Sequence, residues 1–382
     1  MLIDELQTPA LLLDRNRLHS NITRMAKKAE ANDVRLRPHI KTHKCIEVAN
    51  LQRSEGASSI TVSTVWEAAA FATSGFDDIT LAVPMVRDKV EYVVRLAKSI
   101  TMNVLVDSAS HVEWLDRETT HREAEIGVLI KVDCGYHRCG VDPDSEYLVE
   151  LAQKIDTAKW LDFRGILTHA GHAYDATSVE QIRSVAQQEQ NVMARVTKRL
   201  ADNGLGPEVV SIGSTPTMSL APAIRDEITE IRPGNYVFYD YDQVGLGSCS
   251  YTDCALTVLA SVIGNYGDRL VIDAGATALS KDLGPVHVDA KNGYGRVFLD
   301  GDIVEPTGDR VVSVSQEHGK IRLEPESPLR EARPRDCIRI LPNHSCLTAN
   351  LFDSYAVYSG ETIVDSWKIL RQRDRGIFAT NA

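Results

Sequence analysis

The segment 37–44 (RPHIKTHK) holds a lysine that could act as a nucleophile. Lys41 stands where a run of apolar, extended residues ends. The basic residues that surround it in the sequence are Arg37, His39, His43 and Lys44. A lysine ammonium is not nucleophilic, but burial and cationic neighbours lower the pKa of the amine, which then forms Schiff bases with carbonyl compounds. A solvated basic turn has the same composition, so this interpretation needs support from other segments.

A second segment has the composition of a phosphate-binding turn. Gly213, Ser214 and Thr215 follow a strand-like run and precede a helix-compatible stretch. Small residues expose backbone N–H groups and hydroxyls add donors, which is how a phosphate is held at a helix N-terminus. Gly234 and Asn235 could supply further donors after the next strand. An ordinary helix cap is the alternative, but a phosphate site that faces a reactive lysine suggests pyridoxal phosphate (PLP).

Three further side chains are candidates for contact with this cofactor. Arg138 lies in the segment 133–140 (DCGYHRCG), and His169 and Tyr174 lie in the segment 168–174 (THAGHAY). An arginine beside the pyridine nitrogen would discourage its protonation, and a tyrosine hydroxyl could donate to cofactor or substrate. A surface ion pair for Arg138 and a satisfied core position for His169 are the alternatives.

His344 and Cys346 form a His-x-Cys pair that suits a metal ion. Side chains two residues apart point to the same side of an extended backbone. Imidazole and thiolate together are ligands that Zn²⁺ prefers, although Mn²⁺ or Mg²⁺ is also possible here. Two protein ligands leave positions open for substrate or water. A single pair of this kind is a weak signal when it stands alone.

Alternating strands and helices must position these residues. Apolar strand-like runs recur about every 20–40 residues, and amphipathic stretches such as 178–202 lie between them. The candidate strands are 9–14, 34–41, 58–65, 79–84, 102–108, 126–133, 162–169, 208–213 and 230–238. Such βα units predict an α/β fold with a (β/α)8 barrel, whose active site lies at the carboxyl ends of the strands. An open doubly wound sheet is the alternative, but no GxGxxG motif follows the first strand.

The pattern changes near residue 247. Short apolar runs separated by turn residues replace the amphipathic stretches, which predicts a mainly antiparallel β domain. We therefore expect a barrel domain over 8–246 and a β domain over 247–382.

The composition excludes several classes of protein. The chain has 382 residues, 43% hydrophobic and 25% charged, with a net charge of −11, which argues against nucleic-acid binding. No apolar run approaches the ~20 residues that span a bilayer, so no membrane association is expected. The N-terminus lacks a signal-peptide layout, and the seven cysteines are scattered and odd in number. We expect a cytoplasmic protein with reduced cysteines.

Together these segments resemble fold-type III PLP enzymes of the D-serine dehydratase and D-threonine aldolase family, which includes D-threo-3-hydroxyaspartate dehydratases. The matching segments, in order along nearly the whole chain, are 8–10 (TPA), 37–42 (RPHIKT), 64–68 (TVWEA), 213–217 (GSTPT), 232–236 (RPGNY), 273–275 (DAG), 316–319 (QEHG) and 342–346 (PNHSC). The resemblance implies an alanine-racemase-like barrel with a β domain that residues 1–7 join. It implies Lys41 as the Schiff-base lysine, and His344 and Cys346 as metal ligands. It also implies a homodimer that acts on a small D-amino acid.

The resemblance implies dehydration of a D-3-hydroxy amino acid to a keto acid and ammonia, with Lys41 and His344 as the catalytic residues. Family dehydratases have cysteine at the position of Cys346, whereas typical D-threonine aldolases have aspartate. Retro-aldol cleavage to glycine and an aldehyde is the first alternative. An amino-acid racemase and a PLP-binding protein without turnover are the others, and fold analogy alone favours the racemase.

Overall fold

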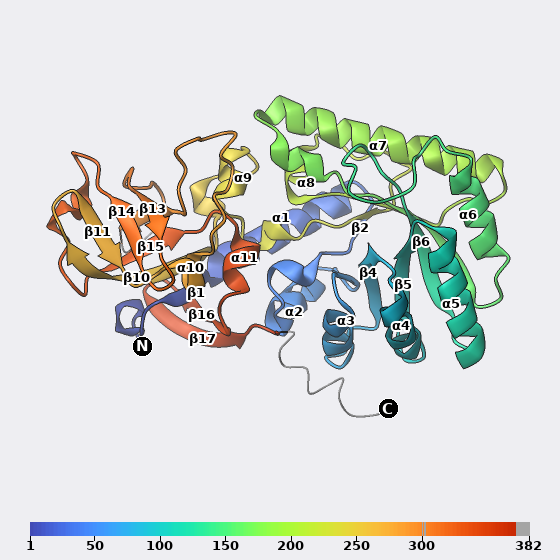
Figure 1. Ribbon diagram of the computed structural model, residues 1–382, viewed down its shortest axis with the longest axis horizontal. Coiled ribbons are helices and arrows are strands. Elements are labelled where there is room, and N and C mark those ends of the chain that lie inside the picture. The colour runs from blue at the N-terminus through green and yellow to red at the C-terminus, as the bar shows by residue number, and fades with distance from the viewer. Residues whose placement is uncertain (300, 302, 372–382) are drawn as a thin grey trace.

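The computed structural model of the protein describes residues 1–299, 301 and 303–371. Two bodies lie side by side: a barrel clad in helices, on the right in Figure 1, and an antiparallel β body on the left. Helix α1 (Arg15–Ala31) runs from the β body along the barrel. Residues of both bodies can therefore meet at their junction.

Eight parallel strands form the barrel within the described part of the chain, in the order β2-β9-β8-β7-β6-β5-β4-β3. A parallel bridge between His39 and Thr61 closes the ring. The strands are β2 (Arg35–Leu36), β3 (Ile60–Val62), β4 (Asp78–Pro84), β5 (Thr101–Val106), β6 (Ile126–Lys131), β7 (Leu161–Leu167), β8 (Val209–Ile212) and β9 (Glu230–Ile231). The barrel predicted from the sequence is confirmed.

Side chains alternate between the two faces of each strand and so fill two layers. Leu105 packs inside the barrel with Leu129, Leu167 and Val209. Its neighbour Val104 belongs instead to the large cluster that includes the helices outside. Those helices are α2 (Ile46–Ser54), α3 (Val65–Ala72), α4 (Val90–Ala97), α5 (Ala109–Arg122), α6 (Tyr147–Asp156), α7 (Val179–Asp202) and α8 (Thr215–Leu220). The short helix α9 (Tyr241–Gly245) follows the barrel in the chain and lies against the β body (Figure 1).

The strands before Lys41 and before Asn235 are much shorter than the sequence predicts. β2 and β9 have two residues each. Pro38 and Pro233 explain the difference, because proline has no N–H with which to continue a ladder. A 3-10 helix follows each proline, over residues 40–42 and 235–237. The lysine is therefore held on a short helical turn beyond the strand end.

The β body contains nine described strands in the order β11-β14-β13-β12-β15-β10-β1-β16-β17, and a further pairing of β10 with β11 closes six of them into a small barrel. The strands are β1 (Ala10–Asp14), β10 (Leu256–Asn265), β11 (Arg269–Ile272), β12 (Arg296–Leu299), β13 (Arg310–Val314), β14 (Gly319–Arg322), β15 (Cys337–Leu341), β16 (Ser354–Ser359) and β17 (Thr362–Lys368). Two short helices, α10 (Ala276–Leu279) and α11 (Ser345–Ala349), complete it. The predicted, mainly antiparallel β domain is confirmed.

Strand β1 lies in the β body, not in the barrel where the sequence analysis put residues 9–14. It pairs antiparallel with β10 and parallel with β16. Leu11, Leu12 and Leu13 are all buried, and a run that is apolar on both faces fits either sheet, so the pattern could not decide between them. The chain enters the barrel only with α1.

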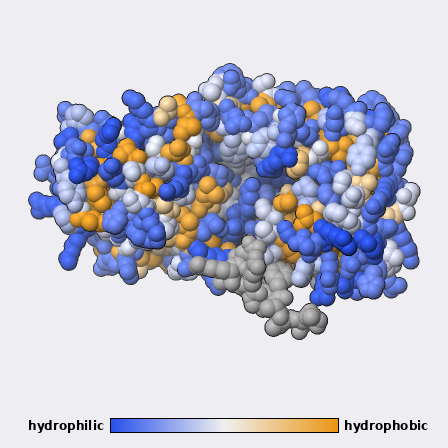
Figure 2. Space-filling view, viewed as in Figure 1, coloured by the Kyte–Doolittle hydropathy of each residue, from blue (hydrophilic) through white to orange (hydrophobic). Residues whose placement is uncertain are grey.

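Hydrophilic residues cover most of the face in Figure 2, with apolar residues scattered among them. Among residues 1–299, 301 and 303–371, no helix has both the length and the apolar character that crossing a bilayer demands. Residues 372–382, which belong to the expected β domain, lie outside the described residues.

Candidate active site

A cavity of about 540 Å³ opens between the carboxyl ends of the barrel strands and the β body. All the residues that the sequence analysis singled out for the site line it: Lys41, Arg138, His169, Tyr174, Gly213, Ser214, Thr215, Gly234, Asn235, His344 and Cys346. Four lysines and arginines face the cavity, and Asp175 is the one carboxylate among its described lining residues. The cavity therefore suits an anionic ligand.

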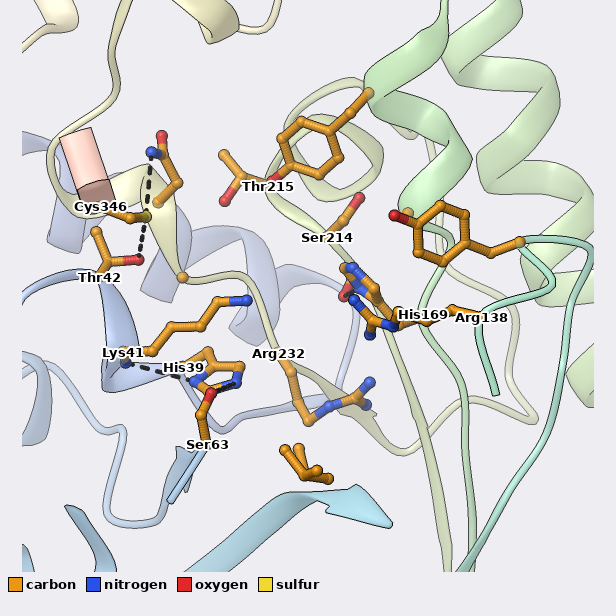
Figure 3. Close-up of a pocket in the computed structure, with 18 of the residues that line it drawn as sticks. His39, Lys41, Thr42, Ser63, Arg138, His169, Ser214, Thr215, Arg232 and Cys346 are labelled. Atoms are coloured by element: carbon orange, nitrogen blue, oxygen red, sulfur yellow. Dashed lines mark hydrogen bonds between the residues drawn. The ribbon is translucent and has the colours of Figure 1, made fainter. Parts of the chain in front are cut away.

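Lys41 extends from its helical turn into the cavity, toward His169 and Arg138 (Figure 3). Its backbone N–H donates to Nδ1 of His39 at 3.5 Å. Ser63 lies on the other side of that ring, with its Oγ 3.3 Å from Nε2. The histidine is thus held between the lysine turn and the loop after β3.

The other basic neighbours do not crowd the lysine as the sequence analysis expected. Arg37 turns into the barrel, where Nε donates to Glu230 at 2.6 Å and the guanidinium makes a bidentate pair with Asp78. The buried His43 lies with Nδ1 3.1 Å from the N–H of Cys45. Nζ of Lys44 donates to Asn350. The backbone forms a helical turn over residues 40–42, so side chains that are neighbours in the sequence point in different directions. Their proximity in the sequence therefore did not predict their proximity to the lysine amine.

Two other cationic side chains, which come from different strands of the barrel, line the cavity together with Lys41. Lys131 ends β6 and Arg232 follows β9, and each side chain is 5% exposed. Burial lowers the pKa of Lys131 to about 8 and that of Arg232 to about 10. Burial also lowers the pKa of His169, and Lys41 and Arg138 lower it further. The imidazole of His169 is accordingly neutral, at the centre of a positive cluster. The sequence analysis gave Lys131 no role, although its place at a strand end was a usable signal.

Tyr136 organises the loop after β6. Its ring lies edge-on to His169, with centroids 6.1 Å apart, and stacks on His172 at 6.3 Å. The guanidinium carbon of Arg138 lies 5.2 Å from the same ring centroid. Gly171 permits this packing, because a Cβ there would come within 2.3 Å of the Tyr136 ring. The sequence analysis missed this tyrosine, whose role depends on contacts across two loops.

The Gly213–Thr215 turn links β8 to α8. Gly213 has φ +110°, a conformation that favours glycine, and a Cβ there would meet Met218 at 2.9 Å. The Ser214 N–H donates to Oγ1 of Thr217 at 2.9 Å, and the two hydroxyls form a capping box. Oγ1 of Thr215 accepts from the Tyr236 N–H. The hydroxyls thus rigidify the turn at the cavity wall.

Asn235 ties the barrel to the loop that carries the His-x-Cys pair. Its amide Nδ2 donates to Asp240 at 2.6 Å and to Ser345 Oγ at 2.8 Å. Asp240 also accepts from the Ser345 N–H at 2.8 Å. Gly234 lies against His39, where a Cβ would come within 2.9 Å of the His39 carbonyl oxygen. The hydrogen bonds of Asn235 and Asp240 to Ser345 hold the β body over the cavity.

His344 and Cys346 lie at the start of α11. Nδ1 of His344 is 3.2 Å from Asp242 and 3.9 Å from Asp282. One ligand atom of each of these three residues lies within 4.8 Å of the others. Burial would lower the pKa of His344, but Cys346 and the carboxylates outweigh it and raise that pKa. Burial would raise the pKa of Cys346, but His344 outweighs it and lowers that pKa. These opposite pKa shifts favour transfer of the thiol proton to the ring, toward an imidazolium–thiolate pair.

Two contacts join this pair to the rest of the cavity. The Cys346 thiol donates to Oγ1 of Thr42, the residue after Lys41, at 3.2 Å (Figure 3). The second contact is from Nδ2 of Asn235, which donates to Sγ of Cys346 at 3.8 Å. Tyr174 lines the same cavity: burial raises the pKa of its hydroxyl, and the nearby charges of Cys346 and Asp240 raise it further. The tyrosine is therefore a neutral donor near both loops.

Comparison with known proteins agrees with this geometry. A family model described as "Alanine racemase, N-terminal domain" matches residues 13–242, and one described as "Putative serine dehydratase domain" matches residues 255–358. The chain is 36% identical to a D-serine dehydratase of Dictyostelium discoideum, over 96% of this chain and 97% of that one. It belongs to the D-serine dehydratase and D-threonine aldolase family of fold-type III PLP enzymes.

Two further relatives are similar over the same length. A D-threo-3-hydroxyaspartate dehydratase of Delftia sp. strain HT23 is 35% identical, over 96% of this chain and 97% of that one. A solved structure of a cysteine-to-alanine mutant of D-threo-3-hydroxyaspartate dehydratase, in a metal-free form, superimposes with a TM-score of 0.92 at 34% identity and covers 97% of this chain and 99% of that one. The named members are dehydratases and aldolases, so the family is one of lyases.

Proposed function

We propose that the protein is a PLP- and metal-dependent lyase that removes water from a D-3-hydroxy amino acid, D-serine or D-threo-3-hydroxyaspartate. Hydrolysis of the dehydrated product then gives a keto acid and ammonia. The contact between Cys346 and Thr42 carries this proposal. Because Thr42 follows Lys41, the lysine amine and the His344–Cys346 pair face one small ligand. The full-length similarity to two dehydratases supports the same conclusion.

The cavity fits PLP in size and charge. Its four lysines and arginines balance a phosphate and a substrate carboxylate. We assign covalent attachment to Lys41, and the phosphate to the Gly213–Thr215 turn with the backbone at Gly234 and Asn235. The ring would contact Arg138, His169 and Tyr174. When bound, PLP withdraws electrons from the substrate Cα. Once the substrate amine has displaced Lys41 from the cofactor, the freed Lys41 amine would be able to take the Cα proton.

We assign the metal to His344 and Cys346. A thiolate ligand favours Zn²⁺ over Mg²⁺ or Mn²⁺. When bound, the metal acts as a Lewis acid toward the β-hydroxyl and makes it a better leaving group. Asp242 accepts from Nδ1 of the imidazole and so keeps Nε2 available.

A comparison of three substrates tests this function. The purified protein is incubated with D-serine, D-threo-3-hydroxyaspartate and D-threonine, each with and without EDTA. We expect a keto acid and ammonia from one of the first two, lost on chelation. Glycine and an aldehyde would show aldolase chemistry, an enantiomeric amino acid would show a racemase, and no product at all would show a PLP carrier.

The expected assembly and location stay predictions. The family resemblance favours a homodimer. A cytoplasmic location, a domain boundary near residue 246 and no contact with nucleic acid or membrane are the expectations from the sequence. Light scattering of the purified protein measures the mass in solution, and about twice the chain mass of 42.2 kDa is expected.

A further inference from the structure

A buried carboxylate stands behind the cavity without lining it. Glu189 lies in α7 and is 0% exposed. A carboxylate loses its hydration on burial, so polar partners must replace the water. Its Oε1 accepts two backbone hydrogen bonds, from the Ala170 N–H at 3.1 Å and from the Gly213 N–H at 3.0 Å. One oxygen atom therefore joins the loops that follow two neighbouring strands, β7 and β8.

Each of these amides adjoins a residue of the cavity wall. Ala170 follows His169, and Gly213 precedes Ser214. On the cavity side, Nδ1 of His169 lies 3.4 Å from the Gly213 carbonyl oxygen. The two loops are thus joined twice, by the imidazole at the surface of the cavity and by Glu189 from behind. A shift of the carboxylate would change the separation of His169 from the Gly213–Thr215 turn.

The second oxygen of Glu189 is not used in the same way. Oε2 is buried and has no hydrogen-bond partner among the described residues. Burial raises the pKa of this carboxyl, and the Gly213 N–H and the charge of Arg232 oppose the rise. The backbone N–H groups of the two loops thus donate to Oε1 and not to Oε2.

We propose that Glu189 is a positioning residue, which sets the distance between the His169 loop and the Gly213–Thr215 turn through its two hydrogen bonds to Ala170 and Gly213. It does so without contact with the cofactor. The position of the acceptor oxygen, which the length of the side chain determines, sets this distance. The negative charge of the carboxylate does not. This inference rests on the proposed binding of PLP.

Three variants separate reach from charge. Glu189→Gln keeps the acceptor and removes the charge, Glu189→Asp keeps the charge and draws the acceptor back by one methylene, and Glu189→Met keeps the volume and has no comparable acceptor. Apoprotein is titrated with PLP, followed by visible absorbance and by circular dichroism of the bound cofactor. Because drawing the acceptor back or removing it breaks both hydrogen bonds, we expect Glu189→Asp and Glu189→Met to bind PLP about tenfold or more weakly, and Glu189→Gln within about threefold of the wild type.

Gln190→Leu is the matched control. Gln190 is the next residue of α7, is also buried, and joins the helix to a different loop through Ala223 and Arg225. Its loss should lower the melting temperature and leave PLP affinity within about threefold, since that loop does not line the cavity. If the methionine variant does not fold, the aspartate and glutamine variants decide the question.

Four results would overturn the inference. Wild-type affinity in Glu189→Asp would show that reach is unimportant, and weak binding by Glu189→Gln with normal binding by Glu189→Asp would show that charge is what matters. A wild-type protein that does not bind PLP would overturn the proposed function together with the inference. Unchanged dichroism of the bound cofactor in the variants that bind weakly would show that its orientation does not depend on this residue.

Discussion

Nδ1 of His344 lies 3.2 Å from a carboxylate oxygen of Asp242. The two residues are far apart in the sequence: Asp242 lies in α9, and His344 directly precedes α11. The backbone holds them in register, because the Asp242 N–H donates to the Asn343 carbonyl at 3.0 Å. A carboxylate on one ring nitrogen fixes the tautomer and leaves the other nitrogen available to a metal.

Asp242→Ala should therefore weaken metal binding. Loss of such a partner typically lowers metal affinity about 10–100-fold, and we expect Asp282→Ala to have a smaller effect because its carboxylate is 3.9 Å from Nδ1. Competition with a chromogenic chelator measures both affinities. If the two carboxylate variants lost the metal while Cys346→Ala kept it, the ion would lie on the carboxylate side of His344.

Cys346→Ala should lose the metal and the lyase activity and still bind PLP. The thiol is a ligand in the proposed metal site, whereas its contact with the lysine turn runs through Thr42 alone. Metal analysis and visible absorbance of the same sample measure the two properties separately. Cys337→Ala, in β15 of the β body, is the control and should keep both. Unchanged metal content in Cys346→Ala would move the metal site elsewhere.

Lys41→Ala should abolish turnover and the visible absorbance of the lysine-bound cofactor. No other described lysine lines the cavity except Lys131, which is buried and whose Nζ donates to the Val132 carbonyl. Lys44→Ala is a close control, because Lys44 lies three residues away and its Nζ donates to Asn350. We expect that variant to keep its absorbance. A coloured, active Lys41→Ala protein would contradict the assignment.

His43 should make the protein sensitive to mild acid. Burial lowers the pKa of its imidazole to about 3, whereas an exposed histidine titrates near 6.5. Between these values the unfolded chain binds a proton that the folded chain does not, so the free energy of unfolding falls as the pH drops. From pH 7 to pH 5 this residue should contribute a loss of about 2 kcal/mol.

Urea denaturation at a series of pH values measures that contribution. The His43→Gln variant lacks the titrating group, so its free energy of unfolding should fall less steeply than that of the wild type below pH 6.5. The difference between the two curves isolates this residue from the carboxylates, which titrate in both proteins. Parallel curves would show that the folded protein protonates His43 normally.

The position of many cavity residues could be predicted because a barrel brings all its strand ends to one rim. Lys41, His169 and Ser214 are far apart in the sequence, yet each follows a strand, and all three line one cavity. The barrel and the antiparallel β body were also predictable, since amphipathic helical stretches give way to short apolar runs near residue 247 of the sequence. What these residues do in the cavity stays a prediction.

Other features depend on contacts that no local pattern records. Glu189 is one glutamate in a helix of 24 residues, and its burial follows from which face of α7 meets the two loops. Asp242 sits in a short polar segment whose backbone pairing with Asn343 fixes it beside His344. The lengths of β2 and β9 were in principle readable from Pro38 and Pro233, because proline interrupts a ladder.

Strand β1 makes the β body discontinuous in the sequence. Since β1 lies between β10 and β16, the barrel is in effect inserted into a sheet whose two parts come from opposite ends of the chain. The polypeptide crosses between the bodies twice, so a single cut near residue 246 would leave two fragments still joined through a shared sheet. A chimera that exchanges the β body must therefore carry residues 1–14 along with the rest, and truncation of those residues would remove an interior strand.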